Sequence, residues 1–289
     1  MTEITSLTAV NLSTGYSGKE VLHNINFDIS TPGIYIVLGE NGSGKTTLFR
    51  AITGLLKPFK GKVNFNGMPI QDSEVRISYL GHNEAIPVGM NVFRVIKFFA
   101  ELENVNDDVL ESVIDRFSLR DILRKQYNEL SRGQKKRISL AKSLLVSGDI
   151  MILDEPTSNL DPSVSSMIRN LIKEESRDRI VLYSSHNLYE AMDLGSYVLA
   201  LRDGNLEYFG DLRGLSVQNY KIGIRADGIE KCDLRYKTEG NFYVFDVESP
   251  QKTSELISLL VAQGVRIYEV KDMSNPLESF YGKNKPGGE

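Results

Sequence analysis

The 289-residue sequence predicts an α/β fold built on a mostly parallel sheet, with a small α+β domain at its C-terminal end. Short apolar runs alternate with amphipathic helical patterns over residues 33–185, and this alternation is typical of parallel sheets. The first thirty residues instead predict antiparallel strands, and residues 91–145 predict helices only. After about Leu215 the order of expected elements changes to three strands, a helix, a strand and a helix.

Composition places the chain among ordinary globular proteins, with 41% hydrophobic and 25% charged residues. The net charge of −4 disfavours nucleic acid as a partner, because proteins that bind it usually carry a surplus of Lys and Arg. The sequence contains no run of about 18 apolar residues, so we expect no membrane span. We also expect no signal peptide. Cys232 is the single cysteine, so an intrachain disulfide is excluded, which fits a reducing cytoplasm.

The N-terminal elements follow from alternation and from glycine-rich turns. Alternating polar and apolar residues predict strands at 7–13 and 21–29, with TGYSGKE between them, and a further strand at 61–67. The apolar run 33–39 predicts a buried strand, and the pattern over 45–56 predicts a helix directly after a Gly-rich turn.

The middle of the chain is predicted to be helical and then to return to strands. Apolar residues three and four apart predict helices over 92–102, 109–117 and 135–145. Apolar runs at 150–155 and 179–185 predict strands, and the pattern between them predicts a helix over 163–175 that follows Pro162. Residues 197–210 resemble a hairpin with Asp203–Gly204 in its turn.

The C-terminal part is predicted to be a separate small domain. We expect strands at 220–226, 232–237, 241–247 and 265–271, and helices at 253–263 and 276–281. The predicted boundaries are therefore a large domain over 1–214, a small α+β domain over 215–283 and a flexible tail over 284–289.

The stretch GENGSGKT, from Gly39 to Thr46, fits the phosphate-loop pattern G-x-x-x-x-G-K-[ST] between a strand and a helix. Its glycines let backbone N–H groups point at phosphate oxygens, and the helix N-terminus adds its dipole. Lys45 supplies a cation for the β- and γ-phosphates, and Thr46 offers a hydroxyl to Mg²⁺. The alternative is a Gly-rich strand-to-helix turn without a ligand. The predicted nucleotide-binding residues of the loop are Gly39, Glu40, Asn41, Gly42, Ser43, Gly44, Lys45, Thr46 and Thr47.

Two acids end the apolar run DIMILDE. Asp154 would lie beside the phosphate loop and hold Mg²⁺ if the two strands are neighbours, and Glu155 would orient and deprotonate the attacking water. His186 follows the next predicted strand and could contact the γ-phosphate. Taken alone, the two acids would more simply be explained as charges beside a loop or as a helix cap. The histidine alone would have a surface or structural role.

Together, GENGSGKT, LSRGQ, ILDEP, SNLD and SSH occur in an order that resembles the nucleotide-binding subunit of an ABC (ATP-binding cassette) transporter, over roughly residues 4–214. The resemblance implies an ABC ATPase fold, with a phosphate-loop parallel core, an antiparallel β subdomain and a helical subdomain. It also implies an ATPase whose cofactors are ATP and Mg²⁺.

The resemblance further implies a head-to-tail dimer in which the signature of one subunit meets the ATP held by the other. The signature here is Ser131, Arg132, Gly133 and Gln134, and Asp161 would be the D-loop residue that couples the two sites. Ser131 is a good N-cap for a helix over about 132–146, and Gly133 permits close backbone approach. Arg132 stands where the family keeps a glycine, so its side chain faces either the phosphates or solvent. Without the other motifs, this stretch would be a capped, solvated basic helix.

Two further positions follow from the resemblance. The family has a Gln in the loop before the helical subdomain that reaches towards the metal and the water, and His82 stands at that position here, with Asn83 next. The family often stacks an aromatic residue on adenine, and Tyr16 offers such a π-face. The alternative for Tyr16 is packing on its own strands.

The expected function is ATP-driven transport through separate integral membrane permease subunits, from a peripheral position on the cytoplasmic face. Val92, Phe93, Ile96, Phe98 and Phe99 could dock these subunits or simply pack in the core. Residues 265–282 resemble the tail of multidrug-type exporter ATPases through Leu277, Glu278 and Phe280, which favours export. The alternatives are an importer ATPase, and a non-transport ABC ATPase acting on ribosomes or nucleic acid. The partner cassette could be identical or related.

Overall fold

The structure is a computed structural model that describes residues 6–81, 89–146, 148–158, 160–185, 188–212, 220–249 and 251–274, with the backbone only at 188 and 189. The chain divides into two compact units, Met1–Gly210 and Asp211–Glu289. Each unit has its own sheet arrangement and its own apolar core.

An antiparallel sheet opens the first unit. It contains β1 (Leu7–Tyr16), β2 (Lys19–Ile29), β4 (Lys60–Phe65) and β5 (Met68–Pro69), in the order β2-β1-β4-β5. Ser17 and Gly18 form the turn between β1 and β2, and both have positive φ angles, of 51° and 79°. This two-residue geometry matches the twist of a hairpin, so the strands continue to the pair Tyr16–Lys19, further than the sequence predicts.

The second sheet of this unit is the predicted parallel core. It contains β3 (Gly33–Leu38), β6 (Ile77–Leu80), β7 (Ile150–Asp154), β8 (Ile180–Ser185), β9 (Tyr197–Arg202) and β10 (Asn205–Asp211), in the order β10-β9-β3-β8-β7-β6. The pairs β3–β8, β3–β9, β7–β8 and β6–β7 are parallel. β7 is not a neighbour of β3, because β8 lies between them. β6 was not predicted, since four residues are too few to show a period.

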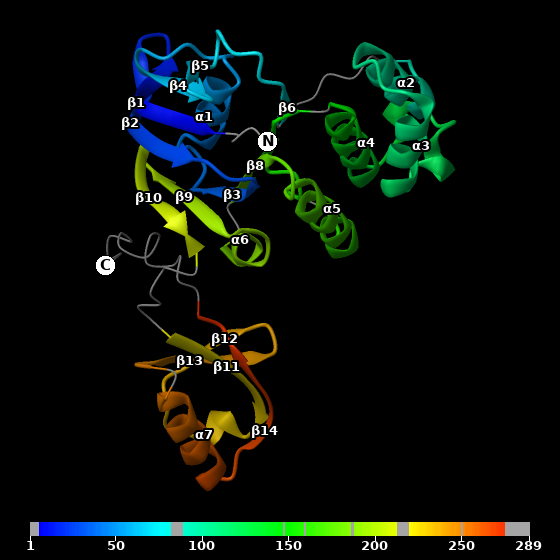
Figure 1. The fold of residues 1–289 in the computed structure, drawn as a ribbon. Coiled ribbons are helices and arrows are strands. Elements are labelled where there is room, and N and C mark those ends of the chain that lie inside the picture. The colour runs from blue at the N-terminus through cyan, green and yellow to red at the C-terminus, as the bar shows by residue number, and fades with distance from the viewer. Residues whose placement is uncertain are drawn as a thin grey trace. The chain divides into compact units, whose positions relative to one another are not determined.

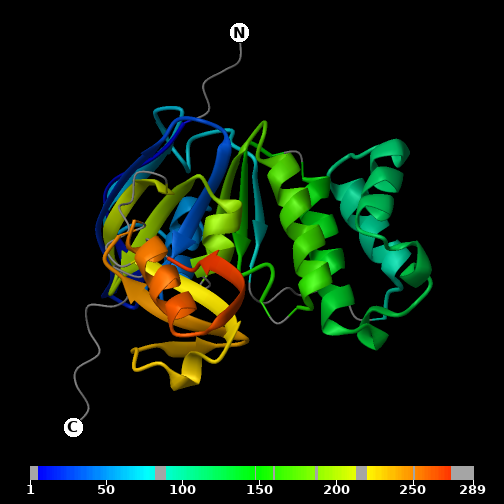
Figure 2. The same cartoon turned by 90° about the horizontal axis from the view of Figure 1, so that it is seen from below.

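Six α-helices accompany these sheets in the described part of the first unit (Figure 1). They are α1 (Lys45–Ile52), α2 (Val92–Leu102), α3 (Asp107–Arg116), α4 (Arg132–Leu145), α5 (Pro162–Glu175) and α6 (Leu188–Leu194). α1 contacts β1, β2 and β7, whereas α4 contacts β6 as well as α2 and α3. In Figure 2, α4 and α5 lie beside the parallel sheet, and α2 and α3 lie farther out. Within the described ranges, no helix is long and apolar enough to cross a membrane.

The main core lies between the two sheets and around α1. Its buried side chains come from β1, β2, β3, β4, β7, β8 and β9, and α1 contributes Leu48, Phe49, Ala51 and Ile52. Phe49 and Ile52 are fully buried. Burial of this kind stabilises the fold by about 25 cal/mol per Å² of apolar surface, so the helix that begins at the phosphate loop is anchored in this core.

In its described residues, the second unit is an antiparallel sheet with one α-helix. Its strands are β11 (Tyr220–Asp227), β12 (Lys237–Glu239), β13 (Phe242–Val247) and β14 (Arg266–Asp272), in the order β12-β13-β11-β14, and its helix is α7 (Lys252–Ala262). The strand predicted over 232–237 is wrong, because only Lys237 belongs to a strand. Leu234 and Tyr236 still pack against the core from an irregular segment, which explains the alternating pattern. The helix predicted over 276–281 lies outside the described residues.

Candidate nucleotide site

The phosphate loop joins β3, whose residues from Ile34 onward are buried, to the start of α1. Gly44 precedes the helix with a φ of 106°, a left-handed conformation that favours glycine. A Cβ at Gly44 would also lie 2.5 Å from the Leu22 side chain, and one at Gly39 would collide with the Ser43 hydroxyl. Gly44 is thus favoured by its backbone conformation, and Gly39 by the Leu201 carbonyl oxygen, which would lie 2.8 Å from a Cβ there.

Lys45 is only 6% exposed and its ammonium is held by the loop itself. Nζ donates to the carbonyl oxygens of Gly39, at 2.7 Å, and Glu40, at 3.1 Å. Burial lowers the pKa of Lys45, while the nearby carboxylates of Glu155 and Asp154 oppose that shift. The loop therefore places a partly desolvated cation where phosphate oxygens would neutralise it.

Asp154 ends β7 and is 2% exposed. Thr46 Oγ1 donates to its Oδ2 at 2.7 Å, and Ser184 Oγ donates to its Oδ1 at 2.7 Å. The hydroxyl of Thr46 and the carboxylate of Asp154 are oxygen donors of the kind that Mg²⁺ prefers, and the magnesium ion usually adds phosphate oxygens and waters to such a pair. The pair predicted from sequence is therefore brought together, although β8 separates their strands.

Glu155 follows Asp154 with a φ of 49°, a left-handed conformation that is unusual for a residue with a side chain. Its backbone N–H donates to Ser184 Oγ at 2.8 Å. Its carbonyl accepts from the N–H and the hydroxyl of Ser158, at 3.3 and 3.0 Å. Glu155 is thus placed by a tight turn fixed to the end of β8.

These residues line one pocket of about 430 Å³. Its lining residues are Tyr16, Val21, Asn41, Gly42, Gly44, Lys45, Thr46, Thr47, Asp154 and Glu155. Tyr16 is 40% exposed, and its hydroxyl accepts from Arg50 Nη1 at 3.1 Å. The Arg50 guanidinium also lies 5.8 Å from the centre of the Tyr16 ring, at cation–π distance. Arg50 therefore fixes the orientation of the aromatic ring that borders the pocket.

The loop is supported from outside the motif by the turn between β9 and β10. Asp203 and Gly204 have φ angles of 47° and 77°, so this is a tight two-residue hairpin turn. Gly204 N–H donates to the Ser43 carbonyl at 3.2 Å, and its own carbonyl accepts from His23 N–H at 2.8 Å. The turn thus connects the phosphate loop to β2.

The signature residues form the start of α4. Ser131 Oγ accepts from Gln134 N–H at 3.2 Å, and Gln134 Oε1 accepts from Ser131 N–H at 3.1 Å, a reciprocal capping box. Arg132 is exposed. A Cβ at Gly133 would meet Leu160 at 3.9 Å, so the signature lies beside the segment that leads to Asp161, the exposed residue before α5. Among the described residues lining the Lys45 pocket, none belongs to 131–134.

Three predicted site residues lie outside the described residues, namely His82 with its neighbour Asn83, and His186. Ser184, Arg50 and Gly204 were missed by the sequence reasoning. A polar residue at the carboxyl end of a buried parallel strand was the available signal for Ser184, because such ends line ligand crevices. For Arg50 and Gly204 no local pattern existed, since their roles depend on which segments the fold brings together.

Fold and site together define a nucleotide-binding protein of the phosphate-loop class. A family model for the ABC transporter matches residues 22–158. The zinc import ATP-binding protein ZnuC of Wolbachia pipientis wMel is 31% identical, over 67% of this chain and 78% of its own length. The cytochrome c biogenesis ATP-binding export protein CcmA of the same organism is 31% identical, over 63% of this chain and 90% of its own. The chain belongs to the family of ABC transporter ATP-binding proteins and is an ABC ATPase.

Other similarities extend over more of the chain or concern structure. An uncharacterized ABC transporter ATP-binding protein, YdbJ of Bacillus subtilis strain 168, is 29% identical over 92% of this chain and 90% of its own length. The structure of cbiO1 from Clostridium perfringens aligns with a TM-score of 0.62 at 27% identity, over 72% of this chain and 89% of that one. A dimeric cassette, MJ0796 bound to ADP and Pi, aligns with a TM-score of 0.65 at 22% identity. The alignment covers 72% of this chain and 99% of that one. These alignments confirm the predicted ABC ATPase fold.

Proposed function

We propose that this ATPase powers export through separate membrane permease subunits and works as a head-to-tail dimer of cassettes. Its main support is the arrangement of the motifs. Lys45, Thr46, Asp154 and Glu155 converge on one pocket, whereas the described lining of that pocket contains none of the signature residues 131–134. A second subunit supplying its own signature would complete such a site, and the MJ0796 cassette of similar fold is a dimer.

In the proposed reaction, the loop N–H groups and Lys45 bind the phosphates of ATP and neutralise their charge. Thr46 and Asp154 would hold Mg²⁺, which when bound supplies further charge stabilisation at the phosphate oxygens. Glu155 accepts a proton from water as the water oxygen bonds to the γ-phosphorus. The bond between the γ-phosphorus and the oxygen that bridges it to the β-phosphate breaks, and this oxygen leaves with ADP. ADP and phosphate are the products. His186 would contact the γ-phosphate.

The proposed role of the partner cassette rests on the start of α4. The capping box fixes the first turn of this helix, whose N–H groups and dipole suit a phosphate. Ser131, Gly133 and Gln134 would meet the γ-phosphate of the partner's ATP, and Arg132 is exposed at the same helix end. Asp161 lies on the neighbouring segment and would couple the two sites. Tyr16 would stack on adenine in the orientation that Arg50 gives it.

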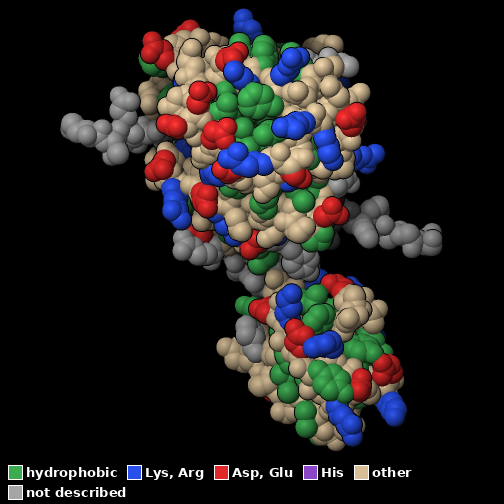
Figure 3. All heavy atoms as spheres, turned by 90° about the vertical axis from the view of Figure 1, so that its right-hand side faces the viewer, with side chains coloured by type: hydrophobic (Ala, Val, Ile, Leu, Met, Phe, Trp, Pro, Cys, Tyr) green, Lys and Arg blue, Asp and Glu red, His purple; other side chains and the backbone are tan. Residues whose placement is uncertain are grey.

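The position at a membrane is proposed from the helical subdomain. Val92, Val95 and Ile96 of α2 are buried, while Phe93 and Phe98 are 38% and 39% exposed. Figure 3 shows the side of the molecule on which α2 and α3 lie, and hydrophobic side chains gather there among charged ones. The helix therefore offers an apolar surface in addition to its core face. We propose that a permease docks there, at the cytoplasmic face of the membrane.

Export is proposed over import on two grounds. Residues 265–282 resemble the tails of exporter ATPases, although Leu277, Glu278 and Phe280 lie outside the described residues. One relative at 31% identity is named as an export protein. ZnuC and the spermidine/putrescine protein PotA of Mesoplasma florum are named as import proteins, so import is the competing direction.

The variant Glu155→Gln tests the mechanism. It keeps the size and polarity of the side chain but cannot accept a proton, so we expect ATP binding and ATP-dependent dimerisation to persist while kcat falls at least about 100-fold. Glu174→Gln is the control, because it makes the same replacement of a carboxylate by an amide at an exposed position on α5. It should keep the parent rate. Hydrolysis by Glu155→Gln at the parent rate would exclude Glu155 as the base.

The same variant tests the direction of transport in cells. If the complex exports, a small molecule should accumulate inside cells that carry Glu155→Gln instead of the parent chain. Depletion of a compound inside those cells would show import instead. Purification of the tagged parent chain from solubilised membranes should bring a polytopic membrane protein with it, and recovery of ribosomes or DNA in its place would contradict a transport role.

A further inference from the structure

We propose that Glu190, on α6, is a positioning residue for the general base, and that its carboxylate fixes the turn that carries Glu155. The inference deepens the proposed function and depends on the role given there to Glu155. No sequence motif pointed to Glu190, which lies on a helix that the sequence pattern did not predict.

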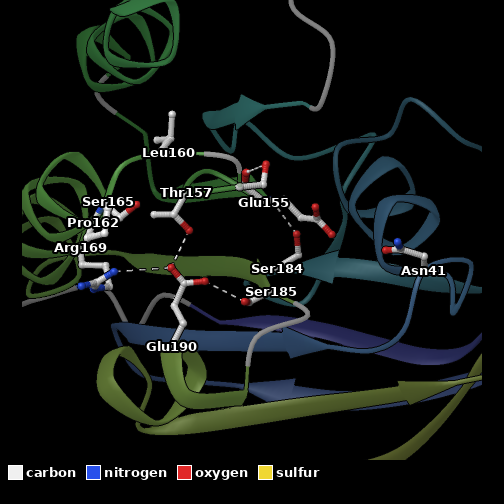
Figure 4. A pocket seen from close by; sticks show the side chains of 11 residues that line it. Asn41, Glu155, Thr157, Leu160, Pro162, Ser165, Arg169, Ser184, Ser185 and Glu190 are labelled. Atoms are coloured by element: carbon white, nitrogen blue, oxygen red, sulfur yellow. Dashed lines mark hydrogen bonds and ion pairs between the residues drawn. The ribbon is translucent and has the colours of Figure 1, made fainter. Parts of the chain in front are cut away.

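The Glu190 side chain is 12% exposed. Its carboxylate accepts hydrogen bonds from hydroxyls of β8 and of the segment after β7. Oε1 accepts from Thr157 Oγ1 at 2.5 Å and from the Tyr183 hydroxyl at 2.8 Å. Oε2 accepts from Ser185 Oγ at 2.8 Å. Figure 4 shows the carboxylate between Thr157 on one side and Ser185 on the other. One side chain thus joins the segment after β7 to the end of β8.

Glu190 Oε1 lies in a cluster of oxygens joined by hydroxyl protons. Thr157 Oγ1 and the Tyr183 hydroxyl also lie 2.8 Å from each other, so three oxygens share only two hydroxyl protons. Hydrogen bonds to a carboxylate are about twice as strong as those between neutral groups. Both hydroxyl protons therefore form their strongest hydrogen bonds when Thr157 and Tyr183 donate them to Glu190. Burial raises the pKa of Tyr183 far above its ordinary value, so its hydroxyl remains a donor.

The link to Glu155 is short and runs through one turn. Glu155 has a left-handed backbone, and Ser184 Oγ holds its N–H at the beginning of the turn. Thr157 lies two residues later and is held by Glu190. The turn is therefore fixed at both ends, by Ser184 and by Glu190, and an unusual conformation of this kind persists only where its surroundings enforce it.

The turn is not held by close packing on this side. A second pocket, of about 510 Å³, lies between Glu155 and Glu190 (Figure 4). Its lining is largely polar and comprises Asn41, Glu155, Thr157, Ser158, Leu160, Pro162, Ser165, Arg169, Ser184, Ser185 and Glu190. Among the described residues on this side, polar contacts hold the Thr157 side chain, and they come from Glu190 and from the Tyr183 hydroxyl, which itself donates to Glu190.

An anion site in this pocket fits the charges less well. Arg169 is the cation among the lining residues, and it already pairs with Glu190 at 3.9 Å and with Asp193 at 3.3 Å. The two carboxylates of Glu155 and Glu190 face the same space and would repel a phosphate. Arg169 instead orients Glu190, which supports a positioning role for the cluster.

The test compares ATP turnover and ATP binding in four variants. Glu190→Ala removes the carboxylate that holds Thr157, and displacement of a catalytic group by about 1 Å can lower a rate about 100-fold, so we expect kcat to fall by between about 10- and 100-fold. Glu190→Gln should lie between this variant and the parent. Thr157→Val should lower kcat several-fold, and Thr157→Ser, which keeps the hydroxyl, should restore it. KM and the Kd for a fluorescent ATP analogue should stay within about two-fold of the parent values.

Tyr183→Phe is the matched control for a purely structural effect. Like Thr157→Val, it removes one hydroxyl donor to Glu190 Oε1, but Tyr183 belongs to β8 and not to the turn. We expect the two variants to lower Tm similarly and Thr157→Val to lower kcat further. Parent kcat in Glu190→Ala, equal kcat in Thr157→Val and Tyr183→Phe, or a joint loss of kcat and ATP affinity would each overturn the inference.

The Glu155→Gln measurement separates this inference from the proposed function. Inactive Glu155→Gln together with fully active Glu190→Ala would reject the positioning role alone. Fully active Glu155→Gln would reject the proposed base, and with it the reason for positioning. If Glu190→Ala is not recovered folded, the Thr157 pair still decides the question, because Thr157→Ser keeps the shape of the site.

Discussion

Lys45 is buried at this site, although a charged ammonium group is more stable in water. Its ammonium is buried, hydrogen bonded to two carbonyl oxygens of the loop, and has a lowered pKa. A charged group held away from water reduces stability unless its partners compensate fully. The phosphates of ATP would provide the compensation, so the residue is arranged for the bound state.

We therefore expect Lys45→Met to leave the nucleotide-free protein at least as stable as the parent and to remove its response to ATP. Saturation at about 100 times Kd stabilises a protein by about 2.7 kcal/mol, and the variant should lack this gain in thermal unfolding with Mg-ATP. A variant that is destabilised without ATP but still shifts with it would contradict this reasoning.

The pH dependence follows from the same lowered pKa. Between the lowered native value and the ordinary lysine value of 10.5, the unfolded chain binds more protons than the native protein. Stability therefore rises with pH in that interval. In nucleotide-free protein, the free energy of unfolding of the parent relative to Lys45→Met should increase as pH rises towards 10.5, as denaturant titrations at several pH values would show.

At the scale of elements, α4 and α3 begin with comparable caps but differ in their proposed roles. Ser131 caps α4, and Asn106 caps α3 by accepting from Val109 N–H at 2.9 Å. Replacing such a cap with alanine costs about 1 kcal/mol of stability. Only the α4 start carries the signature sequence.

Ser131→Ala and Asn106→Ala are therefore a matched pair. Both should lose about 1 kcal/mol in the free energy of unfolding, while only Ser131→Ala should also lose ATPase activity and ATP-dependent dimerisation. Denaturant unfolding and steady-state hydrolysis measure the two effects separately. Equal ATPase rates in the two variants would show that the α4 start has no part in hydrolysis.

Elements also show what the sequence could predict and where it could not. The long strands and helices were predicted because an apolar face repeats at a period of two or 3.6 over enough residues. β6 and α6 were missed because they are too short to show a period, yet α6 carries Glu190. The motif order identified Asp154 and Glu155, but the contacts of Ser184 with both residues, and those of Glu190 with the turn after Glu155, depend on strand order, which local sequence does not encode.

At the scale of the whole molecule, each of the two units has an apolar cluster among its described residues. The first surrounds α1, and the second contains Ile222, Ile224, Phe245 and Leu260. YdbJ aligns with 92% of this chain, so the similarity extends beyond the first unit. We propose that the second unit is a separate domain, with the boundary between Gly210 and Asp211.

Two separate transitions are therefore expected in thermal unfolding of the full chain, and Mg-ATP should raise only one of them. Ile224 is fully buried in the second core, and Ile224→Ala should destabilise by about 2–5 kcal/mol. We expect this variant to lower only the transition that ATP does not shift. The corresponding change in the first core, Ile52→Ala, should lower the other transition. One cooperative transition that responds to both changes would contradict independent folding.

The turn at Asp203–Gly204 has a consequence for the order in which the site is made. The phosphate loop leaves the ribosome early, but the N–H that binds its Ser43 carbonyl belongs to Gly204. Asp154, whose carboxylate accepts from Thr46, also comes later in the chain. So does Ser184, whose hydroxyl donates to that carboxylate. A nascent chain therefore carries the complete phosphate-loop motif long before it has a nucleotide site, and it acquires one only when synthesis has passed the last hairpin of the parallel sheet.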